Sequence, residues 1–393
     1  MWIDLALCPN ITSENNVESA MLDKLGSQNY SRVAHYFRDV DSSRKSCPKY
    51  IPESFAPSCY VEEPFWPSRF LLRVALRFHH IWATPGSEGG DAKDAQPGVS
   101  FSAFNVADLV ALTNGSEPAD EHATQYAITF TLRAAESAGM ARVQSSQPEW
   151  RWPYTGNYRR AIAKIEADGF EGNTIPGLDL TQEHWAGVGI VVATRSDAIR
   201  LQYDILSLID EGIVSVNHFD HLLVCEHLPR SCEGLTEPEI QEAVDAACFD
   251  FRACMNISHE SAAAARKDFA DRLCALELST PRARVQEQGG CWVSFDDNTH
   301  PYVRALLKAG RVVVNQEGRY LGTLDEVNPR RDLGERQKIA EVLSQQLQEE
   351  HGVACGYYCV GKSWDPSGLP SYAGRPWSGM HRITDEPDDE DVV

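Results

Sequence analysis

Apolar residues recur along the chain at two spacings, and each spacing predicts a different kind of element. In residues 64–84 they lie three or four positions apart, as Phe70, Val74 and Phe78 do, which predicts a helix. Residues 188–193 form a short unbroken apolar run, which is typical of a buried strand. Segments of both kinds occur in both halves of the chain. The pattern therefore predicts an α+β protein.

Residues 1–100 have the least regular pattern. A short helix is expected around residues 17–37 and another over residues 64–84, but residues 9–64 are otherwise rich in Ser, Asn, Pro and Asp. Residues 85–100 hold Gly, Pro and acidic residues without periodicity, which is typical of a loop. We expect an irregular, partly helical N-terminal segment.

Residues 101–183 have the pattern of a winged-helix-like domain. Helices are expected over residues 104–113 and 123–138, and residues 140–143 and 147–154 are expected to form a two-stranded wing. The spacing usual at the passage from the second helix to the wing is found at Leu132, Glu136, Gly139, Met140 and Arg142.

Strands and helices alternate after residue 183. Residues 184–278 are expected to form an α/β domain, with strands at 188–193, 213–216 and 222–224, and Thr236 and Glu239 form a capping box that begins a helix. Residues 291–362 are expected to run strand, helix, strand, strand, helix, strand, the order of a ferredoxin-like unit. Residues 186–295 can be interpreted as an earlier version of the same order. One or two ferredoxin-like units are therefore predicted.

Negative charge is concentrated in two segments. The 393 residues include 36 Lys+Arg and 57 Asp+Glu, for a formal net charge of −21. Residues 201–250 hold 11 acidic residues and one basic residue, and residues 385–393 hold six acidic residues and no basic residue. We expect a disordered acidic tail over residues 363–393 and a protein partner with a basic surface. The rest of the chain is nearly neutral, so the net charge excludes a general attraction to nucleic acid but not a local one.

The composition also indicates a compartment. No segment has the roughly 18 to 20 apolar residues of a membrane helix, and the first residues lack the pattern of a secretory signal. The 11 cysteines are irregularly spaced, which favours reduced thiols. We expect a cytoplasmic protein that does not bind membranes.

One segment has the composition of a nucleic-acid contact. Residues 142–164 contain five basic residues and one acidic residue, interleaved with aromatic side chains. Aromatic rings stack on bases, and guanidinium groups pair with phosphates. The expected contacts are Arg142, Trp150, Arg151, Trp152, Tyr158, Arg159, Arg160 and Lys164. Tryptophans are equally common as core anchors, and Glu117, Asp120 and Glu121 would repel phosphates, so a protein-docking domain is the alternative.

A second group of residues would suit metal or acid–base chemistry. His218, Asp220 and Glu226 lie on one face of an expected strand, and Asp296 and Asp297 follow another strand. Imidazole and carboxylate groups bind divalent metals, so a metal is possible although no cofactor is required. A solvated edge strand and a helix cap are the plainer alternatives. Motifs for nucleoside triphosphate hydrolysis and serine hydrolase chemistry are missing from the sequence.

Three functional hypotheses follow from these features. The first is a nucleic-acid-associated accessory or regulatory subunit of a larger intracellular assembly. The second is a metal-dependent hydrolase or nuclease that uses the His/Asp/Glu group. The third is an acidic adaptor that binds proteins. The sequence leaves open whether the chain is an enzyme.

Overall fold

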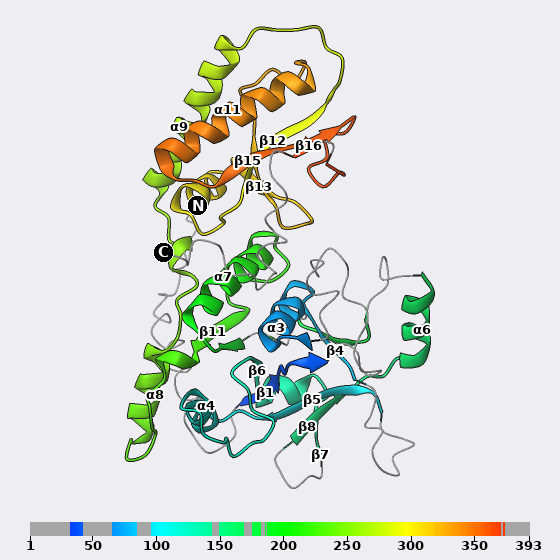
Figure 1. Ribbon diagram of the computed structural model, residues 1–393, viewed down its shortest axis with the longest axis vertical. Coiled ribbons are helices and arrows are strands. Elements are labelled where there is room, and N and C mark those ends of the chain that lie inside the picture. Colours follow the sequence, from blue (N-terminus) through cyan, green and yellow to red (C-terminus); the bar gives the residue numbers. More distant parts are fainter. Residues whose placement is uncertain are drawn as a thin grey trace, which may run out of the picture.

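The computed structural model of the chain describes residues 32–41, 65–84, 96–143, 149–168, 175–181, 185, 187–370 and 372–373. Within these residues the chain is a mixed α+β protein, as predicted, with two main sheets. Figure 1 shows the larger sheet in the lower half of the molecule and the smaller sheet in the upper half.

The larger sheet has seven strands in the order β11-β10-β6-β1-β5-β8-β7. Its strands in chain order are β1 (Arg32–Tyr36), β5 (Gly98–Ala103), β6 (Ala127–Thr131), β7 (Ala141–Val143), β8 (Glu149–Pro153), β10 (Val188–Val192) and β11 (Phe219–Val224). β10 and β11 pair in parallel, and the other neighbours pair antiparallel. The boundary expected after residue 183 therefore falls inside this sheet.

The two faces of the larger sheet are covered differently. One face carries apolar residues such as Phe101, Phe130 and Leu222 and packs against α3 (Ser68–Arg77) and α7 (Arg195–Asp210). The other face packs against α4 (Val106–Thr113) and α8 (Glu237–Ala246) over β6, β10 and β11. On β5 and β8 this second face carries Ser100, Ser102 and Glu149 instead. This part of the second face is therefore polar.

Two predicted helices in this half are strands in part. Residues 32–36, expected to end the first helix, form β1, and the earlier residues of that helix lie outside the described part. Residues 127–131, expected to begin the second helix of the winged-helix-like domain, form β6, and α5 (Leu132–Ser137) follows. Both faces of β6 are buried, so its apolar positions do not alternate as in a half-exposed strand. The paired strands β7 and β8 match the expected wing, but β6 takes the place of part of the second expected helix.

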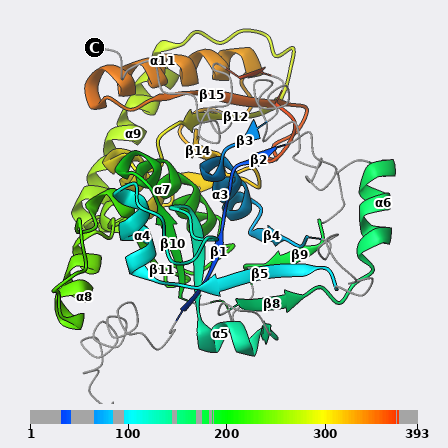
Figure 2. The same cartoon turned by 60° about the horizontal axis from the view of Figure 1, so that its bottom comes forward.

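Other boundaries in this half also differ from expectation. The helix expected over residues 64–84 ends at Arg77, and β4 (His80–Trp82) follows and pairs with β9 (Gly177–Asp179). Residues 213–216, expected to form a strand, form turns and bends. β2 (Val40–Asp41) pairs with β3 (Phe65–Trp66). Figures 1 and 2 both show α6 (Tyr158–Asp168) at the edge of the molecule.

The smaller sheet has five strands in the order β13-β14-β12-β15-β16. The elements of this half are α9 (His259–Ser279), β12 (Gly289–Phe295), α10 (Pro301–Lys308), β13 (Val312–Val314), β14 (Tyr320–Thr323), α11 (Leu333–His351), β15 (Cys355–Gly361) and β16 (Tyr372–Ala373). From β12 to β15 the helices and strands follow the predicted order. α9, α10 and α11 share one buried core with the sheet, which includes Phe269, Val293 and Leu343.

A buried polar junction connects the two halves. Arg304 of α10 forms an ion pair with Asp210 at the end of α7, and each side chain is 5% exposed. Tyr320 of β14 donates a hydrogen bond to the same carboxylate at 2.6 Å. Asn298 donates to the Tyr320 hydroxyl and to the Tyr203 carbonyl, each at 3.0 Å. The junction therefore fixes α7 to the C-terminal half through specific polar contacts.

Within the described ranges, none of the helices has both the length and the apolar composition that crossing a membrane requires.

Candidate functional site

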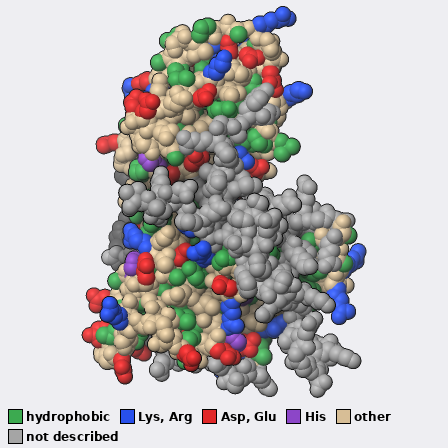
Figure 3. Space-filling model, viewed as in Figure 1, with side chains coloured by type: hydrophobic (Ala, Val, Ile, Leu, Met, Phe, Trp, Pro, Cys, Tyr) green, Lys and Arg blue, Asp and Glu red, His purple; other side chains and the backbone are tan. Residues whose placement is uncertain are grey.

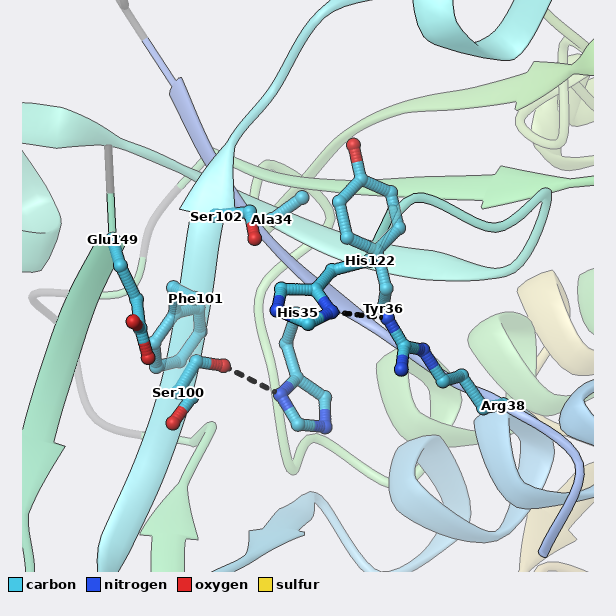
Figure 4. A pocket seen from close by; sticks show the side chains of 9 residues that line it. All are labelled: Ala34, His35, Tyr36, Arg38, Ser100, Phe101, Ser102, His122 and Glu149. Carbon is cyan, nitrogen blue, oxygen red and sulfur yellow. Dashed lines mark hydrogen bonds between the residues drawn. The ribbon is translucent and has the colours of Figure 1, made fainter. Parts of the chain in front are cut away.

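A polar pocket opens where β1 and β5 separate. The two strands pair at Val33 with Ala103 and at Ala34 with Ser102, and the ladder then stops. Nδ1 of His35 instead donates to the Ser100 carbonyl at 3.0 Å. A cavity of about 290 Å³ lies here (Figure 4). We call it the strand-gap pocket, and it is lined by Ala34, His35, Tyr36, Arg38, Ser100, Phe101, Ser102, His122 and Glu149.

One side of the strand-gap pocket is cationic. The Arg38 guanidinium group contacts Nδ1 of His122 at 2.5 Å and donates to the Glu121 carbonyl at 3.1 Å. Arginine can only donate, so this Nδ1 is the acceptor. Both contacts use Nη2 of Arg38, and its Nε and Nη1 bond to none of the described residues. Those two nitrogens can therefore bind an anionic ligand.

His35 has a defined tautomer. A carbonyl oxygen can only accept, so Nδ1 carries the proton and Nε2 carries a lone pair. Burial lowers the pKa of His35, and its hydrogen bond to Ser100 opposes that shift only in part. Within the described part of the chain, Nε2 has no hydrogen-bond partner. At neutral pH His35 is therefore an unprotonated acceptor and a possible base.

The opposite side of the pocket carries a carboxylate. Glu149 is the first residue of β8 and pairs with Ser102 in the strand register. Figure 4 shows its carboxylate across the pocket from Arg38 and His122. No described residue forms an ion pair with it. An anion fits at Arg38, whereas hydroxyl groups, such as those of a ribose, fit at Glu149.

β8 connects this pocket to the predicted nucleic-acid residues. Arg151 lies on the same face of β8 as Glu149 and donates to the Gln96 carbonyl at 3.0 Å and to the Ser100 hydroxyl at 3.4 Å. Arg159, Arg160 and Lys164 are exposed on α6 and form no ion pair with a described residue. Figure 3 shows basic side chains at the edge where α6 lies. Four of the expected cations thus follow one another from the pocket to α6.

The aromatic members of the predicted contact are more buried. Trp150 is 5% exposed and belongs to the core, with Arg142 5.8 Å from its ring centroid. Trp152 and Tyr158 are half-buried, and the Tyr154 ring lies 6.4 Å and 6.3 Å from theirs. The core-anchor alternative therefore describes Trp150, and only the other rings have edges accessible to a ligand.

The predicted metal ligands His218, Asp220 and Glu226 lie before, on and after β11. Asp220 forms an ion pair with Arg32 at 3.0 Å, and Arg32 is itself buried. His218 is buried before the strand begins, whereas Glu226 follows its end and accepts from the Arg195 backbone N–H at 2.5 Å. These three side chains therefore do not form one site.

Asp296 and Asp297 lie in the C-terminal half. Asp297 accepts from the backbone N–H and the hydroxyl of Thr299, each at 2.7 Å, so it orders the turn before α10. The backbone N–H of Asp296 donates to the Ala354 carbonyl. Across the residues that can be described, no three His, Cys, Asp or Glu side chains converge in a way that could hold a metal ion.

Sequence reasoning missed the residues of the strand-gap pocket. His35 falls in a segment that was predicted as a helix, and Arg38 lies 84 positions from His122. Glu149 appeared only as the single acidic residue in a basic segment. The alternation of polar and apolar residues in β5, from Gly98 to Ala103, is the one local signal of a partly polar sheet face.

A family model matches residues in the C-terminal half of the chain. Residues 261–380 match the family model described as "Protein of unknown function (DUF4427)", which is 120 of the 393 residues. No curated protein and no solved structure matches the chain. The strand-gap pocket and α6 lie outside the matched residues.

Proposed function

We propose that the chain binds nucleic acid or its nucleotides, with one phosphate on Arg38 in the strand-gap pocket and further phosphates on Arg151, Arg159, Arg160 and Lys164. The observation that carries this proposal is the path of β8, which places Glu149 in the pocket and Arg151 beside it and leads to α6. Arginine binds phosphate through paired N–H groups, and the exposed α6 cations suit a flexible polyanion.

The acidic segment of residues 201–250 does not oppose this proposal. Within it, α8 exposes four acidic side chains, those of Glu237, Glu239, Glu242 and Asp245. Figure 1 shows α8 and α6 on opposite sides of the molecule. Exposed charges farther apart than about 8–10 Å are largely screened at physiological salt. The acidic face of α8 supports the further proposal that the chain is an accessory subunit with a basic protein partner.

We also propose that residues 289–361 form a ferredoxin-like unit. α10 connects β12 to β13 with β14 lying between them in the sheet, and α11 connects β14 to β15 with β12 between them. This arrangement supports two interleaved split βαβ crossovers. The unit would serve as a scaffold that fixes α7, because its α10 and β14 supply Arg304 and Tyr320 to the polar junction.

Binding of a fluorescently labelled single-stranded oligonucleotide tests the main proposal. We expect binding at low salt that weakens as salt rises, measured by fluorescence anisotropy over a salt series. Replacing Arg159, Arg160 and Lys164 with Ala should reduce the slope of log K against log salt by about 2, because three phosphate contacts are lost. The matched control replaces the exposed Arg266, Arg284 and Arg330, which changes the net charge equally. No binding at low salt, or an equal loss in the control, would contradict the proposal.

A second candidate function is hydrolysis or group transfer on the bound nucleotide, with His35 as the general base. The unprotonated Nε2 of His35 supports it, because a base must be free of its proton at the working pH. We expect conversion of a nucleotide or oligonucleotide, followed by chromatography and mass spectrometry, to fall about 100-fold or more in His35→Gln. Unchanged turnover in that variant, with nucleotide binding retained, would exclude His35 as the base.

A further inference from the structure

A pair of buried thiols lies where β12 and β15 meet. Cys291 and Cys359 are both free and are 1% and 0% exposed. They face each other directly in the antiparallel register, and their sulfur atoms are 3.0 Å apart. Directly opposed residues of an antiparallel pair have Cα atoms about 4.5–5.5 Å apart, within the range of about 4.4–6.8 Å that a disulfide bridges. The two strands therefore hold these cysteines in a position to form a disulfide.

A buried cation accompanies the thiol pair. Arg336 of α11 is 5% exposed and donates to the Gly289 carbonyl, but its Nε is buried without a hydrogen-bond partner. Burial lowers the pKa of Arg336, and the sulfurs of Cys291 and Cys359 are the groups that oppose this shift. Among the described residues, no carboxylate forms an ion pair with Arg336. A buried charge needs a counterion, so this arrangement favours a thiolate in the pair.

The two sulfurs have different roles in their hydrogen bond. The Cys359 thiol donates to the Cys291 sulfur. This hydrogen bond and burial raise the pKa of Cys359, and the charge of Arg336 acts in the opposite direction. Cys359 therefore keeps its proton, and Cys291, which accepts the hydrogen bond, is the sulfur that becomes the thiolate. The thiolate is the nucleophilic form of cysteine.

Trp364 connects this region to the surface. The Arg336 guanidinium carbon lies 4.5 Å from the centre of the Trp364 ring, and the Trp364 side chain is 50% exposed. Figures 1 and 2 both show α11, which carries Arg336, beside β15. Movement of these two side chains, without separation of the strands, would admit a small uncharged oxidant such as hydrogen peroxide.

We propose that Cys291 and Cys359 form a reversible disulfide when the chain meets a peroxide, and that Arg336 is a positioning residue that stabilises the Cys291 thiolate. The thiolate attacks one oxygen of hydrogen peroxide, the O–O bond breaks, and the released hydroxide takes up a proton, which leaves a sulfenic acid and one water. The Cys359 sulfur then attacks the sulfenic sulfur, the S–O bond breaks, and a second water leaves. Two thiols are oxidised to one disulfide, and one peroxide is reduced to two waters.

Peroxide treatment of the full chain, followed by alkylation with N-ethylmaleimide and peptide mapping without reductant, tests this proposal. We expect cross-linked peptides that carry Cys291 and Cys359, and we expect dithiothreitol to remove the cross-link. Alkylation of the exposed Cys274 is the internal measure of how far the peroxide has reacted. A peroxide concentration that oxidises Cys274 but yields no link between Cys291 and Cys359 would overturn the proposal. This measurement uses the unaltered chain and does not depend on whether a variant folds.

Two cysteine variants assign the bond. Cys359→Ser should abolish the cross-link to Cys291. Cys355→Ser, at another buried position of β15, is the matched control and should retain it. A cross-link that persists in Cys359→Ser and is lost in Cys355→Ser would assign the bond to a different pair and overturn the proposal.

The rate of cross-linking tests the role of Arg336. Arg336→Met should slow it by about tenfold, because a change of one unit in the pKa of a thiol changes its thiolate population by that factor. Arg336→Lys, which keeps the charge, should recover most of the rate. Lys338→Met, at an exposed position of the same helix, is the control for a lost charge. Equal rates in Arg336→Met and Lys338→Met would show that Arg336 does not stabilise the thiolate.

Discussion

Replacing Arg304 with Leu should lower the free energy of unfolding by about 3–5 kcal/mol, because it leaves the carboxylate of Asp210 buried without a counterion. Both oxygens of Asp210 bond to Arg304, and both side chains are almost fully shielded from water. Tyr320 donates to the same carboxylate but cannot neutralise its charge. Urea unfolding at neutral pH, followed by circular dichroism, measures the change.

Two further variants separate the charge from the shape of the junction. The double variant Asp210→Leu/Arg304→Leu removes both charges and should recover much of the lost stability. The matched control is Arg330→Leu, at an exposed position, which should change the free energy of unfolding by less than about 0.5 kcal/mol. If Arg304→Leu costs no more than this control, the ion pair does not stabilise the junction.

The C-terminal half could be predicted from the sequence because its elements have simple periodicities. In β12, Cys291, Val293 and Phe295 alternate with residues of the other face, and α11 ends at a glycine in the left-handed conformation. Short connections leave little freedom in the order of elements. The strand order in the sheet and the contact with α7 depend on tertiary packing, so no local pattern indicates them.

The N-terminal half was harder to predict because its central strands are buried on both faces. β1 and β6 lie in the middle of the larger sheet, so their residues lack the alternation that marks a strand with one exposed face. In β6, Ile128, Thr129 and Thr131 are β-branched, which favours a strand, whereas the glycine at position 139 predicts the end of a helix. The prediction of one helix over residues 123–138 is wrong at residues 127–131, and the winged-helix pattern requires a helix there.

Local composition predicted the basic residues of α6 but not the strand-gap pocket. Arg159, Arg160 and Lys164 are close in sequence, so one helix displays them together. His35, His122 and Glu149 come from three separate segments, and the pairing of β1 with both β5 and β6, together with that of β8 with β5, brings them together. The predicted metal site relied on residues that are close in the sequence. The extended strand β11 lies between His218 and Glu226, so closeness in the sequence does not bring their side chains together.

Two histidines, the buried His218 and the half-buried His79, should make the fold sensitive to acid. Burial lowers the pKa of His218 to about 4. Burial also lowers the pKa of His79 to about 4, with Arg77, His80 and His218 acting in the same direction and Asp179 opposing them. In the unfolded chain both imidazoles return to a pKa near 6.5. Below that value the unfolded chain binds protons that the folded chain excludes.

The free energy of unfolding should therefore be highest above pH 6.5 and fall as the pH decreases from 6.5 to 4, by up to about 3 kcal/mol for each histidine. Urea unfolding at several pH values between 7 and 4 measures this fall. The double variant His79→Asn/His218→Gln should have a shallower dependence, and Asn tolerates the positive φ of 51° at position 79. His259→Asn, at an exposed site, is the control and should leave the dependence unchanged. Parallel curves for the double variant and the original chain would show that these two histidines do not cause the acid sensitivity.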